Sequence, residues 1–264
     1  MAKIKAASAK KENLTEAELQ SVVSYFQEPS NLPLILMLCG VMVFFGGIFV
    51  LIGIVCLGLG IYLYSENQKN KVTDEEFDRI KDKAYGLLDD VAYNKLGLDK
   101  SDTVRENLFI KGPRYYDGGA DLVFKEGEDK VIRYSLHNII ILVFTKKYLA
   151  MYQCALDLQT GNRLNEVTEE FFYKDIVSVG TQVKSSTLLK EGTSFNYIAG
   201  NSKKQISVSQ EVAWESFELR NAGSGSIEVP IKSSEILKQM GGKFEENELD
   251  KVVNSIRAIL RDKK

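Results

Sequence analysis

The chain has 264 residues, of which 44% are hydrophobic, and this is enough to bury at least one core in one or two domains. Its 34 basic and 36 acidic residues leave a formal net charge of -2, which gives no electrostatic support for a nucleic-acid partner. Two of its three cysteines, Cys39 and Cys56, lie in one hydrophobic segment, which leaves only Cys154 in the rest of the chain. A single cysteine cannot form a disulfide framework or a cysteine-ligated zinc site there.

Residues 1–31 are predicted to contain one short amphipathic helix. Thr15 and Glu18 have the spacing of a capping box, and apolar residues at helical spacing follow until Pro29 ends the pattern. The polar face carries few basic residues. We therefore expect the apolar stripe to pack on the rest of the protein or on another copy rather than on lipid.

Residues 32–65 are predicted to be a transmembrane segment, because no charged residue occurs from Pro33 to Tyr64. One straight helix over this stretch would be about 48 Å long, against a hydrocarbon core of about 30 Å. Gly46 and Gly47 near the middle favour a helical hairpin over the alternative of one long helix. Small residues would also allow close helix packing in lipid, and these are Gly40, Gly46, Gly47, Gly53, Gly58 and Gly60.

Basic residues after this segment predict its orientation. They are Lys69, Lys71, Arg79, Lys81 and Lys83. The positive-inside rule then places the C-terminal domain in the cytoplasm, with the chain anchored in the cell (inner) membrane.

A second amphipathic helix is predicted over residues 72–97. Thr73 and Glu76 repeat the capping pattern, and one apolar face follows. We expect this face to dock on the protein's own domain, and the alternative is a self-associating coiled coil.

Residues 105–264 change to short runs rich in β-branched and aromatic residues, which indicates a β domain. A last helix, from about Glu245 to Arg261, has a wide apolar stripe that must cover an edge or mouth of the β structure. The predicted fold class is thus a membrane-anchored α+β protein: a transmembrane helical hairpin, a connecting helix, and an antiparallel β-barrel or sandwich capped by a C-terminal helix.

The predicted strands are Asp121–Phe124, Lys130–Ser135, Asn138–Phe144, Tyr148–Leu156, Glu169–Tyr173, Ile176–Val183, Gln205–Ser209, Ala213–Arg220 and Ser226–Ile231.

The stretch Ile140–Gly180 resembles bacterial pleckstrin-homology-like (PH-like) domains, in which a strand pair around a Thr-basic turn precedes a Tyr-x-Asp-Ile step, here Tyr173 to Ile176. The stretch Trp214–Ile231 and the final helix fit the closing strands and cap of that family, so the resemblance covers about half of the chain. It implies a binding or assembly module, which bacterial members often join to transmembrane helices. Relatives that bind phosphoinositides carry spaced basic residues in an early loop, whereas the Lys146-Lys147 turn is too short for a headgroup.

We find no arrangement of residues that predicts catalysis. His137 is the only histidine, and a lone histidine is more often a hydrogen-bonded structural residue than a base. The glycine and acidic groups lack the spacing of a phosphate-binding or calcium-binding loop. We therefore expect a protein that is not an enzyme, with no metal site and no cofactor.

Two predicted loops are the candidates for a contact surface. Lys111–Gly119 is compact, aromatic and basic, and its alternative role is a rigid turn whose tyrosines pack on the barrel. Lys184–Ser202 is a long second loop. The candidate partner- or lipid-binding residues are Lys111, Arg114, Tyr115, Tyr116, Lys146, Lys147, Lys184 and Lys190.

Two functions remain open from the sequence. The first is a non-enzymatic, membrane-anchored binding or scaffolding protein that displays a PH-like domain at the cytoplasmic membrane face, self-associates and binds an unidentified protein. The second is a lipid- or ligand-sensing module that contacts anionic headgroups. Its basic residues would be Lys111, Arg114, Lys146, Lys147, Lys184, Lys190, Lys203 and Lys204.

Overall fold

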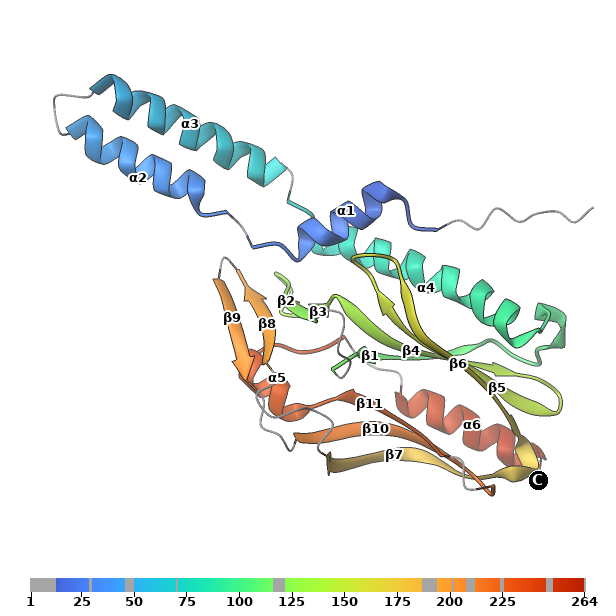
Figure 1. Cartoon of the computed structure of the whole chain (residues 1–264). Coiled ribbons are helices and arrows are strands. Elements are labelled where there is room, and N and C mark those ends of the chain that lie inside the picture. The colour runs from blue at the N-terminus through green and yellow to red at the C-terminus, as the bar shows by residue number, and fades with distance from the viewer. Residues whose placement is uncertain are drawn as a thin grey trace, which may run out of the picture.

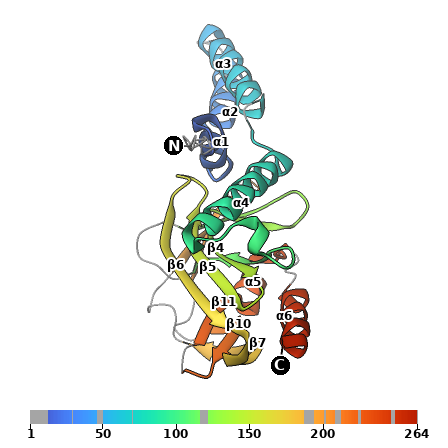
Figure 2. The ribbon, with the colours of Figure 1, turned by 90° about the vertical axis from the view of Figure 1, so that its right-hand side faces the viewer.

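The computed structural model describes residues 13–28, 30–45, 50–69, 71–115, 122–186, 194–200, 202–207, 212–223, 226–245 and 249–263. The helices α2 (Leu32–Phe45) and α3 (Val50–Lys69) project from a β-rich body as a hairpin. Figures 1 and 2 show this hairpin at the end of the molecule away from the strands β7 (Ile176–Ser186) and β10 (Val212–Asn221). The helices are α1 (Glu16–Tyr25), α2 (Leu32–Phe45), α3 (Val50–Lys69), α4 (Asp74–Leu96), α5 (Ser234–Met240) and α6 (Leu249–Lys263), with 3-10 turns η1 (Lys100–Asp102) and η2 (Tyr173–Asp175).

The strands are β1 (Leu108–Pro113), β2 (Val123–Glu126), β3 (Ile132–Tyr134), β4 (Leu136–Phe144), β5 (Tyr148–Asp157), β6 (Arg163–Phe172), β7 (Ile176–Ser186), β8 (Ser194–Ala199), β9 (Ser202–Ser207), β10 (Val212–Asn221) and β11 (Ser226–Lys232).

The predicted transmembrane segment, and with it the predicted fold class, is wrong. No helix in the part of the chain that the structure describes is both long enough and apolar enough to cross a membrane. The physical reason is that the apolar stretch is divided. The 14 residues of α2 rise only about 21 Å, and the last five residues of α3, from Ser65 to Lys69, are polar. The described fold is instead an α+β arrangement with six α-helices and three sheets.

The helices α2 and α3 pack side by side in opposite directions. A Cβ added at Gly40 would lie 2.8 Å from the Leu57 nitrogen, and one added at Gly60 would lie 3.0 Å from the Pro33 carbonyl oxygen. Gly53 is also buried, whereas Gly58 has nothing within 4 Å of an added Cβ. The packing glycines therefore hold the hairpin together within one chain. Gly46 and Gly47 lie outside the described residues.

Both predicted N-terminal caps are confirmed. The Glu18 amide donates to Thr15 Oγ1 at 3.2 Å, and the Thr15 amide donates to Glu18 Oε2 at 2.9 Å. The Glu76 amide donates to Thr73 Oγ1 at 3.2 Å, which satisfies one of the amides at the start of α4. At the other end of α4, Gly97 adopts a φ of 65°, a conformation that glycine reaches without strain.

The helices α1 and α4 dock on the β body. For each helix this confirms the alternative in which its apolar face packs on the protein itself. Their buried side chains share a core with β4 and β5 that includes Val22, Ile80, Leu88, Ile141 and Tyr152. The strand β4 is apolar without alternation because its other face, with Ile140 and Leu142, packs into a second core. A self-associating coiled coil built on this face of α4 would have to displace that core.

The second core lies between two antiparallel sheets. One has the order β1-β4-β5-β6 and the other the order β11-β10-β7, and α6 covers the opening between them. The third sheet, β3-β2-β8-β9, joins β2 and β8 in parallel and packs with α5 around Trp214. Seven strands and α6 therefore form the body, and the third sheet is an addition to it.

Candidate functional site at the root of the helical hairpin

The hairpin is attached where α1 ends and α4 begins, and we call this region the root. The rings of Tyr25 and Phe77 stack there with centroids 4.5 Å apart, and both side chains are buried. The Tyr25 hydroxyl donates to Asp74 Oδ1 at 2.7 Å. The two chain segments that lead into and out of the hairpin are thus fastened to each other.

Lys125 on β2 fastens the root to the third sheet. Its Nζ donates to the Tyr25 carbonyl oxygen at 2.6 Å and lies 3.9 Å from the centroid of the Tyr25 ring. Burial lowers the pKa of Lys125 to about 8, because the charged ammonium loses hydration there. The contacts with the Tyr25 carbonyl oxygen and ring offset part of this desolvation cost.

Arg133 joins β3 to the first turns of α4, within the root. Its Nη2 lies 2.6 Å from Asp78 Oδ2 and 3.0 Å from Asp129 Oδ2, and its Nη1 lies 3.7 Å from Asp74 Oδ2. The side chain is only 7% exposed. Burial acts to raise the pKa of Asp78, but the hydrogen bond from Arg133 and the charge of Lys81 outweigh it and lower that pKa.

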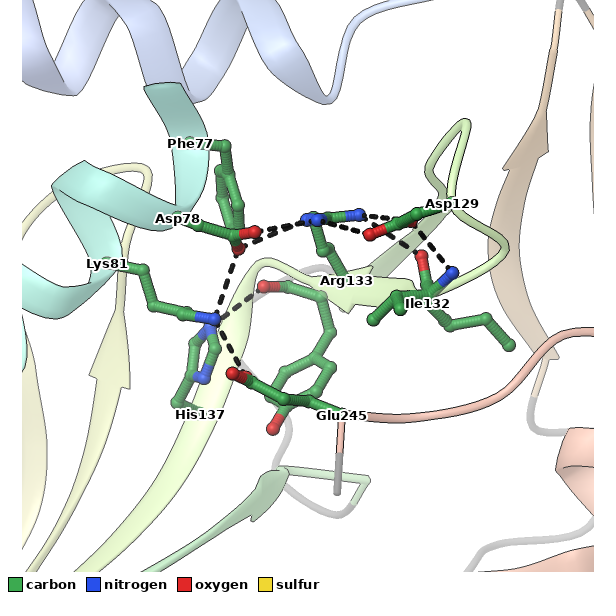
Figure 3. A pocket seen from close by; sticks show the side chains of 10 residues that line it. Phe77, Asp78, Lys81, Asp129, Ile132, Arg133, His137 and Glu245 are labelled. Carbon is green, nitrogen blue, oxygen red and sulfur yellow. Dashed lines mark hydrogen bonds and ion pairs between the residues drawn. The ribbon is translucent and has the colours of Figure 1, made fainter. Parts of the chain in front are cut away.

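A cavity of about 120 Å³ lies beside this arginine. Figure 3 shows Lys81 pointing between Asp78 and Glu245, and its Nζ lies 3.1 Å and 2.8 Å from their carboxylate oxygens. The Glu245 side chain is 70% exposed and comes directly before the chain that leads to α6. The cavity is therefore walled by groups that already neutralise one another, and its ion pairs connect α4, the β2–β3 turn and the C-terminal segment.

His137 lies on the same cavity wall but is occupied on both ring nitrogens. Its Nε2 is 2.9 Å from the Tyr134 carbonyl oxygen, which can only accept, so Nε2 carries the proton. Its Nδ1 is 2.8 Å from the Tyr85 hydroxyl and accepts from it. Burial, with a smaller contribution from Lys81, lowers the pKa of His137 to about 3. A neutral ring with both nitrogens bonded has a structural role.

We expect mild acid to destabilise the protein through His137. Between pH 6.5 and 5 the unfolded chain binds a proton at this residue and the folded chain does not, so stability falls as the pH falls. The loss should be roughly 1 to 2 kcal/mol over this interval, measured by urea unfolding followed through Trp214. The His137→Gln variant should show a flatter dependence, and an equal dependence in both proteins would contradict the assignment.

The described residues contain no group of three or more histidine, cysteine, aspartate or glutamate side chains placed to hold a metal ion.

The described part of the predicted aromatic-basic loop is residues 111–115, and all of these except the half-exposed Lys111 are buried. Lys111 lies within β1 with its Nζ 4.4 Å from the centroid of the Tyr85 ring, and Arg114 is buried with its Nη1 3.3 Å from Asn138 Oδ1. The Tyr115 ring packs 4.6 Å from the ring of Trp214, centroid to centroid. Tyr115 agrees with the alternative of tyrosines that pack on the β structure, whereas Lys111 belongs to a strand. Tyr116 lies outside the described residues.

The remaining candidate residues are also not brought together. Lys146 and Lys147 are exposed in the β4–β5 turn, near the end of α4 away from the root. Lys184 on β7 pairs with Glu228 on β11. Lys190 lies outside the described residues. The described members of the predicted set therefore form no single contact surface.

Sequence reasoning missed the root because its members are far apart in the chain. Arg133 and Asp78 are separated by 55 positions, and Lys81 and Glu245 by 164. The one local signal was the acidic first turn of α4, with Asp74, Glu75 and Glu76, which helix capping already explains.

No family model, curated protein or solved structure matches this chain.

Proposed function

We propose that this chain is a non-enzymatic binding or scaffolding protein that is anchored to a membrane by the α2–α3 hairpin and displays its β-rich body at the membrane surface. Anchoring of this kind needs no crossing, because a short hairpin can enter and leave lipid on the same side.

The observation that carries the proposal is the exposure of apolar side chains all round the hairpin. Leu38 is 63% exposed, Met42 68%, Leu51 79% and Val55 67%. Neither helix has a polar face along this stretch, and the first charged residue of α3 is Glu66. Helices that are apolar on every side require apolar surroundings on every side. Lipid supplies them, whereas one docked protein partner would cover a single face.

The dimensions of the hairpin fit shallow insertion. The apolar part of each helix rises about 21 to 23 Å, less than the hydrocarbon thickness of about 30 Å. The two helices satisfy their own backbone hydrogen bonds, which lipid demands of any inserted segment.

The root supports the display of the body at a fixed position. The stack of Tyr25 on Phe77 fastens α1 to α4, and the contacts of Lys125 and Arg133 connect this root to the third sheet. An inserted hairpin would therefore carry the body with it.

The displayed module is proposed to be of the PH-like kind. The succession of a four-stranded sheet, a three-stranded sheet and the covering helix α6 supports this. The occupied nitrogens of His137 and the neutralised cavity support a role without catalysis.

The cytoplasmic side is the proposed location of the body. Three of the basic residues that follow the hairpin pair with carboxylates: Lys71 with Glu128, Lys81 with Glu245, and Lys83 with Glu18. These pairs leave a smaller positive charge near the hairpin to support this location than the sequence indicated. A C-terminal reporter that is active only outside the cytoplasm should stay silent.

Self-association also stays part of the proposal. Gly58 on α3 has open space beside it, so Gly58→Leu should weaken cross-linking between copies if the hairpin mediates assembly.

The anchoring test compares two valines of similar exposure. Val55 on α3 is 67% exposed and Val183 on β7 is 72% exposed. A charge in hydrocarbon costs about 2.5 to 3.5 kcal/mol, so Val55→Asp in the full chain should weaken binding to zwitterionic vesicles roughly 60-fold or more. Val183→Asp should bind as the wild type does. Failure of the wild type to float with vesicles, or equal effects of both substitutions, would refute anchoring by the hairpin.

A further inference from the structure

The start of β9 lies beside the point where the chain enters the hairpin. Lys203 Nζ on β9 is 2.9 Å from Glu28 Oε1, and Glu28 lies between α1 and α2. Figure 1 shows this end of β8 and β9 close to the start of α2. The β8–β9 hairpin is thus a part of the third sheet that reaches the proposed membrane surface.

The level of the lipid headgroups can be placed on the chain. The apolar stretch begins at Leu32, four positions after Glu28. A headgroup layer is about 5 to 8 Å thick on each side of the hydrocarbon, which is comparable to the reach of these few residues. If Leu32 marks the edge of the hydrocarbon, Glu28 and its partner Lys203 lie among the headgroups.

The strand β9 presents its lysines outward. It is the edge strand of its sheet, and Ser202, Lys203, Lys204 and Gln205 are all exposed. The Lys203–Glu28 pair is itself 42% and 52% exposed, so it contributes little stability and can exchange partners.

We propose that Lys203 and Lys204 contact anionic lipid headgroups when the hairpin is inserted, so that the β8–β9 hairpin is a second membrane contact. This inference rests on the proposed function. It selects two members of the basic set that the sequence suggested, and it predicts that Glu28 competes with lipid for Lys203.

Lys146 and Lys147 are too far away to contribute. The helix α4 runs from the root toward the β4–β5 turn, and its 23 residues rise about 34 Å. Lys146 and Lys147 lie at that far end. Charges separated by more than about 8 to 10 Å in physiological salt are largely screened.

The test measures binding of the full chain to zwitterionic vesicles and to vesicles with about one third phosphatidylserine. Each juxtamembrane lysine is worth about 1 kcal/mol on an anionic surface, or about fivefold in affinity. The double variant Lys203→Gln with Lys204→Gln should therefore lose roughly 10- to 25-fold on anionic vesicles and nothing on zwitterionic ones. The matched control, Lys146→Gln with Lys147→Gln, should behave as the wild type on both.

A gain-of-binding variant tests whether Glu28 competes with lipid for Lys203. Glu28→Gln removes the competing carboxylate and should strengthen binding to anionic vesicles about two- to fivefold, with a steeper salt dependence. Equal losses in the Lys203/Lys204 variant and its control, or no preference of the wild type for anionic vesicles, would overturn this inference alone. Absence of wild-type binding to zwitterionic vesicles would instead refute the proposed anchoring.

Discussion

Replacing Arg133 by alanine should lower the free energy of unfolding by about 3 kcal/mol. The guanidinium is 7% exposed and pairs with Asp78 and Asp129, while Asp74 lies within 3.7 Å. Without it, three carboxylates at the root face one another with no arginine between them. Partial exposure of Asp78 and Asp129 allows some hydration, which keeps the expected loss at the lower end for a broken buried pair.

Urea unfolding followed through Trp214, the only tryptophan, measures this loss because the indole is buried in the core of the third sheet. Arg220→Ala is the matched control: Arg220 is 56% exposed and pairs with Glu218, so its removal should cost less than about 1 kcal/mol. Arg133→Lys should recover only part of the loss, since an ammonium cannot span two carboxylates as the guanidinium does. Equal costs for Arg133→Ala and Arg220→Ala would show that the root is a surface network.

The part of the fold that could be predicted from the sequence is the part that local patterns determine. Capping residues placed α1 and α4 because the cap is made within four positions of the chain. The strands from Leu136 to Asp157 were predictable because the continuous apolar run of β4 and the Lys146-Lys147 turn are local as well.

Two strands were missed for identifiable reasons. Residues 108–113 contain Lys111, Gly112 and Pro113, which indicate a turn, but Gly112 is required where β1 meets β11: an added Cβ would lie 2.7 Å from the Ile231 carbonyl oxygen. The sequence pattern predicts a loop where β8 lies, because this strand is short and polar residues flank it. Its pairing with β2 is parallel and joins residues some 70 positions apart, which no local pattern reveals.

The hairpin shows the limit of hydropathy alone. Uninterrupted apolar composition from Pro33 to Tyr64 predicted a membrane span, yet the packing of Gly40 and Gly60 across α2 and α3 depends on two helices meeting in space. Composition identifies the surroundings that a segment prefers. It does not determine the length of the helices into which the segment divides.

The helix α6 links the closure of the body to the root. Its buried residues Leu249, Val252, Val253 and Ile256 complete the core between the two larger sheets. The segment before it is held at the root by the ion pair of Glu245 with Lys81. Loss of α6 from the core should therefore disturb both the body and the root.

Ile256→Asp should be the most damaging single substitution that we propose, with an expected loss of about 4 kcal/mol or more. Ile256 is 1% exposed and faces the apolar core that includes Phe217 and Leu249, so an aspartate there would be buried without a partner. Ala258→Asp is the matched control, since it introduces the same residue on an exposed position of the same helix and should cost less than about 1 kcal/mol.

Ile256→Val separates packing from charge. It removes one methylene from the same site and should cost roughly 1 kcal/mol. Urea unfolding of the full chain, followed through Trp214, should therefore rank the three variants with Ile256→Asp far below the other two. If Ile256→Asp and Ala258→Asp unfold at the same urea concentration, α6 does not close the core. The apolar stripe of α6 must then have another partner, because side chains at this spacing are not left in water without destabilising the protein.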